Sequence, residues 1–341
     1  MRKESATPLF FLTRSLFFGL GISLLCKYTD KDTYLGAIIG VFLGLLIVLG
    51  YRYIIRQKKD LSLNQVCNKD KVVGFITRAL LLIASIIILT YSLLTYKTFV
   101  SSFLLSTTPV FIIMIPWIIL LIYCAWSGIF MIHRLSSALF PLSLVLSILS
   151  IVSIVGNFNY NNFLPILTTA PSNLIMSILA FAGISSFPGL LTLHFDADVK
   201  HYVSYYLLSA LLVVLVILCI NGVFGEVLVN VFRFPEYMIL KQVKLLDFIE
   251  KIENILSIAW AFDLFITSAF SIYSIKTLVP KKGSALSTLI IVGIVGILIA
   301  QVFDFNYTHE LFLYYALPYV SLAFPIIIIL LFVYLLRKKK S

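Results

Sequence analysis

The sequence predicts an all-α membrane protein with ten transmembrane helices in a 5+5 inverted repeat. Three observations support this prediction: the composition, the number of apolar segments, and matching interruptions in two of them. Apolar residues make up 61% of the 341-residue chain and charged residues only 12%, with a mean hydropathy of +1.06. Because a soluble domain carries about 25% charged residues, this composition argues against a soluble enzyme.

Ten apolar segments are long enough to cross a bilayer, which requires about 20 predominantly apolar residues. They span residues 9–25, 33–53, 72–96, 110–126, 129–155, 173–193, 202–223, 254–276, 284–303 and 311–336. We interpret residues 1–341 as a single transmembrane domain, with a first five-helix repeat at 1–165 and a second at 166–341. Because five is odd, the second repeat enters the membrane from the opposite face, as in many secondary transporters.

The basic residues are distributed as expected for a protein embedded in a bacterial cell membrane. The net charge is +11, and Lys and Arg gather in the loop at 52–71 and in the tail at 337–340. The loop at 225–253 carries acidic residues as well. Basic segments favour the inside, so we expect both termini in the cytoplasm and the loop at 225–253 outside. This pattern indicates a lipid bilayer as the partner of the basic residues and argues against nucleic acid.

The sequence contains no recognisable motif for a metal or for catalysis. The four cysteines have no CxxC spacing, and the segment from His194 to His201 has no HExxH pattern. There is no Ser/His/Asp order, phosphate-binding loop or placeable pair of catalytic carboxylates. We therefore expect no enzyme activity, no cofactor and no metal.

Two apolar segments, each the first of its five, are interrupted by glycines. The interruptions are Gly19-Leu20-Gly21 in segment 9–25 and Gly183-Ile184-Ser185-Ser186-Phe187-Pro188-Gly189 in segment 173–193. A broken helix is tolerated in lipid only where it lines a protein or water cavity, and a matched pair points to a transporter's binding site. The alternative is that the glycines only allow close helix packing, which we favour for Gly36, Gly40 and Gly44.

Two broken helices suit a small zwitterion such as an amino acid. The half-helix that starts after Gly21 offers free N–H groups to a carboxylate, and the half-helix that ends near Gly183 offers carbonyls to an ammonium group. Pro188 suits the first turn of the following half-helix. We expect the solute to contact Gly19, Leu20, Gly21, Phe181, Gly183, Ser185 and Ser186.

Two charged residues lie inside apolar segments. Asp263 is the only acid well inside one, and an intramembrane carboxylate is costly and by default marks function. Asp263 either takes a coupling proton or cation, or is a structural carboxylate bonded to a neighbouring Tyr, Ser or Arg. Arg14 either extends its charged head to the inner interface, which we favour, or forms an inner gate by pairing with an acid.

The loop at 225–253 is amphipathic and predicts one or two short helices over the outer mouth. Its pattern is Phe232-Arg233-Phe234-Pro235-Glu236-Tyr237, then Leu240-Lys241, then Asp247-Phe248-Ile249-Glu250-Lys251-Ile252-Glu253-Asn254, followed by Trp260. With the ten segments and the two breaks, this pattern resembles the spore germination permeases. These are the B subunits of germinant receptors, within the amino acid–polyamine–organocation transporter superfamily.

The resemblance implies an amino-acid-permease fold in which Tyr91 and Thr95 line the pocket, as the third helix does in the superfamily. It also implies that Thr267 and Ser268 match the hydroxyl pair of sodium-coupled relatives. Two functions remain open: a subunit that senses a small amino-acid-like solute, or a carrier that moves an amino acid with H⁺ or Na⁺. A sensing subunit would lie in the spore inner membrane with a membrane partner subunit and a lipoprotein.

Overall fold

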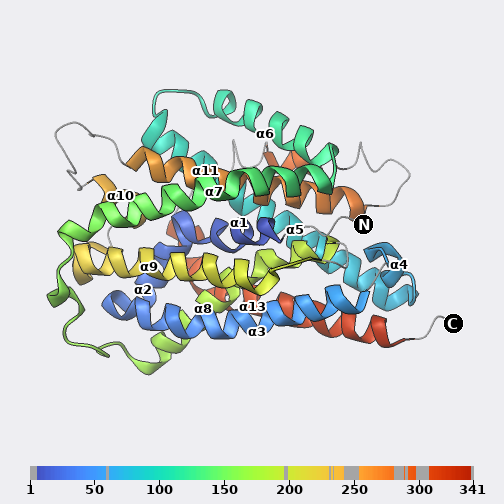
Figure 1. Cartoon of the computed structure of the whole chain (residues 1–341), viewed down its shortest axis with the longest axis horizontal. Helices are drawn as coiled ribbons and strands as arrows, with labels where there is room; N and C mark the ends of the chain where they lie inside the picture. The colour runs from blue at the N-terminus through green and yellow to red at the C-terminus, as the bar shows by residue number, and fades with distance from the viewer. Residues whose placement is uncertain are drawn as a thin grey trace.

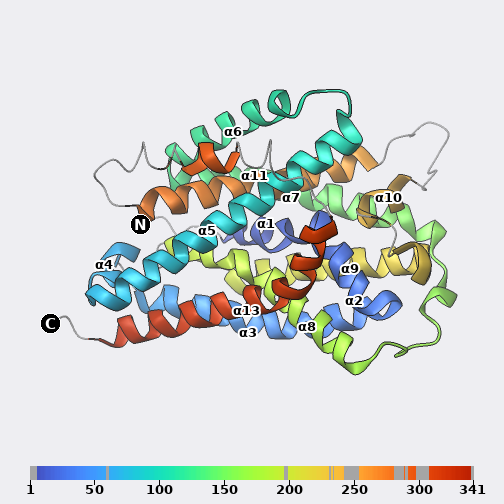
Figure 2. The ribbon, with the colours of Figure 1, turned by 180° about the vertical axis from the view of Figure 1, so that it is seen from behind.

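The computed structural model describes residues 6–58, 61–195, 199–229, 232, 234–241, 253–279, 288, 291–296 and 307–338. The side chains at 20, 226–229, 254–256, 307–315 and 317 lie outside this description. The described residues form helices and no β-strand. The long helices run side by side along the longest axis of the molecule (Figure 1), and the view from behind shows the same arrangement (Figure 2).

The long described helices fall on the expected apolar segments, whereas α4, η5 and α10 lie in the expected loops; η marks 3-10 or π-helical turns. The first half contains α1 (Thr7–Ser15), η1 (Phe17–Gly21), α2 (Ile22–Thr29), η2 (Asp30–Asp32), α3 (Thr33–Lys58), α4 (Leu63–Cys67), α5 (Lys71–Phe99), η3 (Val100–Leu104), α6 (Val110–Trp126), α7 (Ile129–Ile154), η4 (Val155–Asn157) and η5 (Tyr160–Phe163). The second half contains α8 (Pro171–Ser186), η6 (Phe187–His194), α9 (Tyr202–Val229), α10 (Pro235–Lys241), α11 (Glu253–Leu278) and α13 (Tyr307–Arg337). The expected segment 284–303 lies outside the described residues except for 288 and 291–296, which are helical.

Seven helical runs in the described residues are long and apolar enough to cross a membrane, judged by length and composition. They are Ile22–Lys58, Lys71–Leu104, Ile129–Asn157, Pro171–His194, Tyr202–Gly225, Ser257–Leu278 and Pro318–Arg337. The helix α6 is apolar but shorter. These long apolar helices are typical of a membrane-embedded helical protein, which the composition predicts.

The local sequence explains where several helices begin. Asp70 is the N-cap of α5, and its carboxylate accepts two backbone N–H groups of the first turn. Ser62 and Gln65 form a capping box at the start of α4. Pro171 lies in the first turn of α8, where the missing N–H group of proline removes no helical hydrogen bond.

The helix α1 lies in the middle of the molecule. Its residues are all buried, and it contacts α7, α8, α9 and α11. Figure 1 shows α1 between α7 and α9. The surrounding helices expose large apolar side chains, including Phe42, Leu46, Phe75, Phe111, Tyr123, Phe130 and Leu330. An extensive exposed apolar surface is expected where lipid replaces water, so the first apolar segment is enclosed by helices that face the bilayer.

The glycines spaced at four along α3 allow close packing against α8, as expected. A Cβ atom at Gly36 would lie 2.4 Å from the hydroxyl of Ser177, and one at Gly40 would lie 2.7 Å from the Cβ of Phe181. At Gly44 a Cβ would lie 2.6 Å from the hydroxyl of Ser185. Three residues spaced at four on one helix therefore meet three on the other, an arrangement that small residues make possible in membrane helices.

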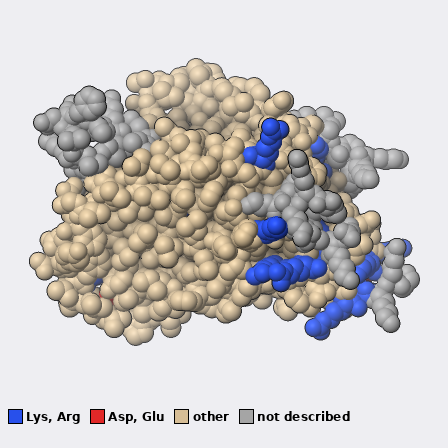
Figure 3. Space-filling view, in the orientation of Figure 1, with Lys and Arg blue, Asp and Glu red and all other residues tan. Residues whose placement is uncertain are grey.

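The two ends of the bundle differ in charge. Figure 3 shows Lys and Arg gathered at the end where α4 and the last turns of α13 lie in Figure 1. At this end Lys58 donates to the carbonyls of Leu193 (3.1 Å) and Phe195 (2.9 Å), and Lys338 pairs with Asp70 at 2.6 Å. The helix α10, which is the described helix within the predicted amphipathic loop, lies at the opposite end (Figures 1 and 2).

Candidate functional site

The first apolar segment is broken where the sequence predicts. The helix α1 ends at Ser15, the π-helical turn η1 follows, and α2 begins at Ile22. Within η1, Phe18 is extended (φ −67°, ψ 127°), and Gly19 has φ 98° and ψ −109°. A residue with a side chain is strained at such a positive φ, so the break depends on glycine at position 19.

Gly19 is enclosed by side chains from elsewhere in the chain. A Cβ atom there would lie 3.0 Å from Cγ2 of Thr95 on α5, and 3.2 Å from the rings of Phe234 and of Trp260 on α11. The hydroxyl of Thr95 and the indole N–H of Trp260 are buried and have no hydrogen-bond partner among the described residues. The break therefore has two unused polar groups as neighbours, one of them from the predicted residue Thr95.

Glu236, on α10, completes this cluster, although it was not among the predicted site residues. Its Oε1 accepts the backbone N–H of Gly19 at 2.6 Å, and the residue is only 2% exposed. Its Oε2 is buried without a partner in the described part of the chain. The helix α10 lies outside the candidate membrane-spanning helices. Burial of the Glu236 side chain away from water raises its pKa to about 8, and the hydrogen bond from the N–H of Gly19 partly opposes this rise.

Tyr91 and Gly21 both lie next to the carbonyl of Leu16, just before the break. The hydroxyl of Tyr91 donates to the carbonyl of Leu16 at 3.0 Å. A Cβ atom at Gly21 would lie 2.3 Å from that same carbonyl oxygen, so no larger residue fits the turn as it stands. The hydroxyl of the predicted residue Tyr91 thus contacts the backbone at the break. The side chain of Leu20 lies outside the described residues.

The second interrupted segment differs from the prediction. We expected a half-helix to end near Gly183 with free carbonyls, but α8 continues to Ser186 and passes directly into η6, with Pro188 in the first turn of η6. The hydroxyls of Ser185 and Ser186 donate to the carbonyl of Ala182, at 3.1 and 2.7 Å. Because serine hydroxyls bond back to the preceding turn, this carbonyl is already engaged. The expectation of free carbonyls for an ammonium group is therefore wrong.

The other predicted residues of α8 serve as packing contacts in the structure. A Cβ atom at Gly183 would lie 2.0 Å from the hydroxyl of Ser321 on α13. The hydroxyl of Ser185 also forms a hydrogen bond of 3.0 Å with that of Tyr206. Phe181 does approach the first break, because its ring centroid lies 4.7 Å from that of Phe17. Phe181 thus packs against the first break, whereas Gly183 contacts α13 and Ser185 contacts α9.

Arg14 and Asp263 meet in the buried core. Arg14 Nη2 donates to Asp263 Oδ1 at 2.6 Å and to Ser143 Oγ at 2.5 Å, and its Nη1 donates to Ser147 Oγ at 2.9 Å. The two charged side chains are 1% and 0% exposed. Our expectation that Arg14 reaches the inner interface is therefore wrong, because partners on α7 and α11 hold its charged head inside. Its pairing with an acid is observed, whereas its action as a gate stays a prediction.

Thr267 and Ser268 follow Asp263 along α11. Ser268 donates to the hydroxyl of Ser92 on α5 at 2.8 Å. The Thr267 hydroxyl and the second oxygen of Asp263 are buried and have no partner among the described residues. Within that part of the chain, no group of three or more His, Cys, Asp or Glu residues is arranged for a metal ion. Asp263 and Thr267 are four residues apart on α11, so their unpartnered oxygens lie on the same face of this helix.

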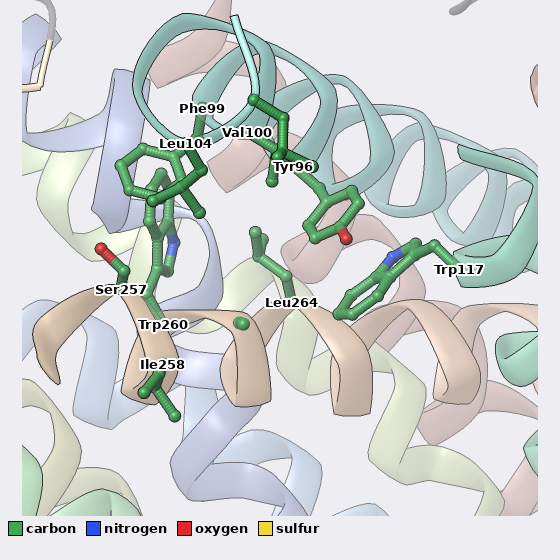
Figure 4. A pocket seen from close by; sticks show the side chains of 11 residues that line it. Tyr96, Phe99, Val100, Leu104, Trp117, Ser257, Ile258, Trp260 and Leu264 are labelled. Carbon is green, nitrogen blue, oxygen red and sulfur yellow. The ribbon is translucent and has the colours of Figure 1, made fainter. Parts of the chain in front are cut away.

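A separate cavity of about 410 Å³ lies between α5, η3, α6 and α11. Figure 4 shows Tyr96 and Trp117 on its walls, and the two rings stack with centroids 3.9 Å apart. Trp260 lines this cavity and also contacts the region of Gly19, so its indole lies between the two. None of the predicted site residues lines the cavity.

Comparison with known proteins agrees with the resemblance seen in the sequence. A family model described as spore germination protein matches residues 5–308. That range contains the break, the ion pair and the α10 cluster. No curated protein matches the chain. Because the family model covers most of the sequence, the chain belongs to the spore germination permease family.

Proposed function

We propose that this protein binds a small zwitterionic solute, such as an amino acid, at the break around Gly19. One observation carries the proposal: a buried backbone N–H at a broken helix, beside the unpartnered polar groups of Thr95 and Trp260. Backbone N–H groups at such breaks bind anionic groups of substrates. The carboxylate of the solute would bind there, and the rings of Phe234 and Trp260 suit its ammonium group through cation–π attraction.

The proposed scaffold is a ten-helix permease with two inverted five-helix repeats. Two features support it: described helices on the expected segments, and a change of helix type in both first segments, at η1 and at η6. The basic end of the bundle would face the cytoplasm and carry both termini, with α10 on the outer side. The membrane would be the bacterial cell membrane, or the spore inner membrane for a germinant receptor.

The site is tested by solute binding to two threonine variants of α5. Purified full-length protein would be titrated with each of the twenty standard amino acids while thermal stability is followed. For an amino acid that stabilises the wild type, Thr95→Val should weaken binding about tenfold, the loss typical of one hydrogen bond to a charged group. Thr98→Val is the matched control, because the Thr98 hydroxyl donates to the carbonyl of Leu94 within α5. Equal affinities for both variants would contradict the site.

Family membership favours a sensing role, as the permease-like subunit of a germinant receptor that acts with a membrane partner subunit and a lipoprotein. The second candidate is an H⁺- or Na⁺-coupled amino acid transporter. The specific observation that favours transport is the buried pair of Arg14 and Asp263, since a coupling ion needs a carboxylate that exchanges partners during the cycle.

Flux separates the two candidates. Protein in liposomes would be supplied with a labelled amino acid that it binds, under an inward proton or sodium gradient. Concentrative uptake that the gradient drives supports the transporter. Binding at the same affinity without uptake supports the sensing subunit.

A further inference from the structure

We propose that the carboxyl group of Glu236 is tethered in the carboxylate subsite at Gly19, so that a solute carboxylate binds only after Glu236 and α10 move away. The inference rests on the proposed function, which it deepens by identifying the group with which the solute competes. It assigns α10 the role of a lid on the outer side of the break.

The geometry at Gly19 is that of a bound carboxylate. The distance from the Gly19 nitrogen to Glu236 Oε1 is 2.6 Å, at the short end for an N–H···O hydrogen bond. The two residues are 217 positions apart, so the contact forms only because α10 folds back onto η1. Thus the chain itself supplies, at the break, the chemical group that an amino acid would present.

Glu236 differs from a carboxylate with a purely structural role. Asp32 shows the structural case: Oδ1 accepts the N–H of Leu167 at 3.1 Å, and Oδ2 accepts the N–H and the hydroxyl of Thr169 at 3.0 and 2.9 Å. Glu236 uses one oxygen and leaves the other buried without a described partner. A half-satisfied buried carboxyl is costly to keep, which favours its release when another carboxylate takes its place.

The described contacts of α10 with α5 and η3 are mostly between aromatic rings. Tyr237 lies 5.1 Å from Phe99 and 4.7 Å from Phe103, measured between ring centroids. Phe234, just before α10, lies 5.8 Å from Trp260 by the same measure. Ring contacts of this kind add only a modest stabilisation beyond that of their buried area. The helix α10 also contacts α9, α11 and α7, and its Ile239 and Leu240 are buried, so lifting it exposes apolar side chains. Among the described residues, the polar bond that this movement breaks is that of Glu236 with Gly19.

Rescue of a truncated side chain by acetate tests the proposal without knowledge of the natural solute. Glu236→Ala should vacate the subsite, and free acetate should then bind at the Gly19 N–H and raise the Tm of the variant saturably. At about ten times its Kd, acetate should raise the Tm by roughly 2–4 °C. Wild type and Glu236→Gln, in which a side chain still fills the subsite, should show no such rise. Glu253→Ala controls for the loss of an acid elsewhere, and sodium chloride at equal concentration controls for ionic strength.

An equal response of Glu236→Ala and wild type to acetate would overturn the proposal. This failure is distinct from failure of the proposed function, because the effect of Thr95→Val on amino acid binding is measured separately.

If Glu236→Ala does not fold, the isosteric variant Glu236→Gln provides the test. At about pH 9, above the raised pKa of Glu236, the ionised wild-type side chain competes better for the N–H than a neutral amide, so an amino acid should bind Glu236→Gln about tenfold more tightly than wild type. Weaker binding to Glu236→Gln would instead identify Glu236 as a direct ligand of the solute and contradict the lid.

Discussion

Arg14 on α1 and Asp263 on α11 form an ion pair of 2.6 Å, although 249 residues separate them. The guanidinium group also bonds Ser143 and Ser147 on α7, and its Cζ lies 4.1 Å from the ring centroid of Phe10. One side chain in the α1 part of the broken segment therefore ties three helices together. Any movement of α1 relative to α7 and α11 must break or rearrange these bonds.

We expect Asp263→Asn to destabilise the protein by about 3–5 kcal/mol, because it leaves the Arg14 charge buried without a counter-charge. The double variant Arg14→Met/Asp263→Leu should recover most of this loss, since it removes both charges. Unfolding in a detergent titration measures both effects, and Thr267→Val is the control on the same helix. The single variants Arg14→Met and Asp263→Leu complete the cycle. If the double variant is as unstable as the sum of these two, the two residues do not act as a pair.

The same substitution tests ion coupling. If Asp263 couples an ion, Asp263→Asn should abolish dependence of uptake on H⁺ or Na⁺ while solute exchange persists. In a sensing subunit it should change the sensitivity to the solute without any flux. Native ion dependence in the purified Asp263→Asn protein would show that this carboxylate is structural.

Gly40→Ala should lower the free energy of unfolding by about 1–3 kcal/mol, the usual cost of overpacking. The added Cβ would lie 2.7 Å from the Cβ of Phe181, which is part of the α3–α8 contact and has little freedom to move. Gly293→Ala is the matched control, because a Cβ at that position meets nothing within 4 Å. Similar melting temperatures for the two variants would argue against close packing of α3 on α8.

Glu236 should make the stability depend on pH. Burial raises its pKa from 4.5 to about 8, so between these values the folded protein retains a proton that the unfolded chain releases. Stability is then greatest at low pH and falls as the pH rises toward about 8. The Tm of wild type minus that of Glu236→Gln should decrease from about pH 5 to about pH 8. A difference that stays constant with pH would contradict the burial of this carboxyl.

Cysteine labelling tests the orientation in the membrane. In a background without Cys26, Cys67, Cys124 and Cys219, single cysteines would replace the exposed residues Arg56 and Lys241. We expect an impermeant thiol reagent added to intact cells to label position 241, at the α10 end, and not position 56. Labelling of position 56 from outside would show that the protein has the opposite orientation in the membrane.

The sequence predicts the first break well because its signal is local. Glycines at 19 and 21 interrupt an apolar run, and a positive φ at Gly19 follows from the conformational freedom of glycine. The second interruption contains glycines as well, yet Ser185 and Ser186 satisfy a carbonyl of the previous turn and the helix continues. The sequence pattern therefore does not distinguish serines that bind a solute from serines that bond to their own helix.

Long-range partners were harder to predict. A lone arginine such as Arg14, near the end of an apolar segment, predicts a residue at the membrane interface. Only the folded structure brings Asp263, Ser143 and Ser147 within hydrogen-bond distance of it. Glu236 belongs to an amphipathic loop, where an acid normally faces water. Its contact with Gly19 depends on how α10 folds back, which hydrophobic periodicity does not encode.

A structure of the full-length protein with a bound amino acid, determined by electron cryomicroscopy, tests the central claim most directly. The decisive quantity is the distance from the solute carboxylate to the nitrogen of Gly19. We predict a hydrogen bond of about 3 Å between them, with Glu236 displaced from its present position. Solute bound in the cavity between α5, α6 and α11, with Glu236 still on Gly19, would contradict the account.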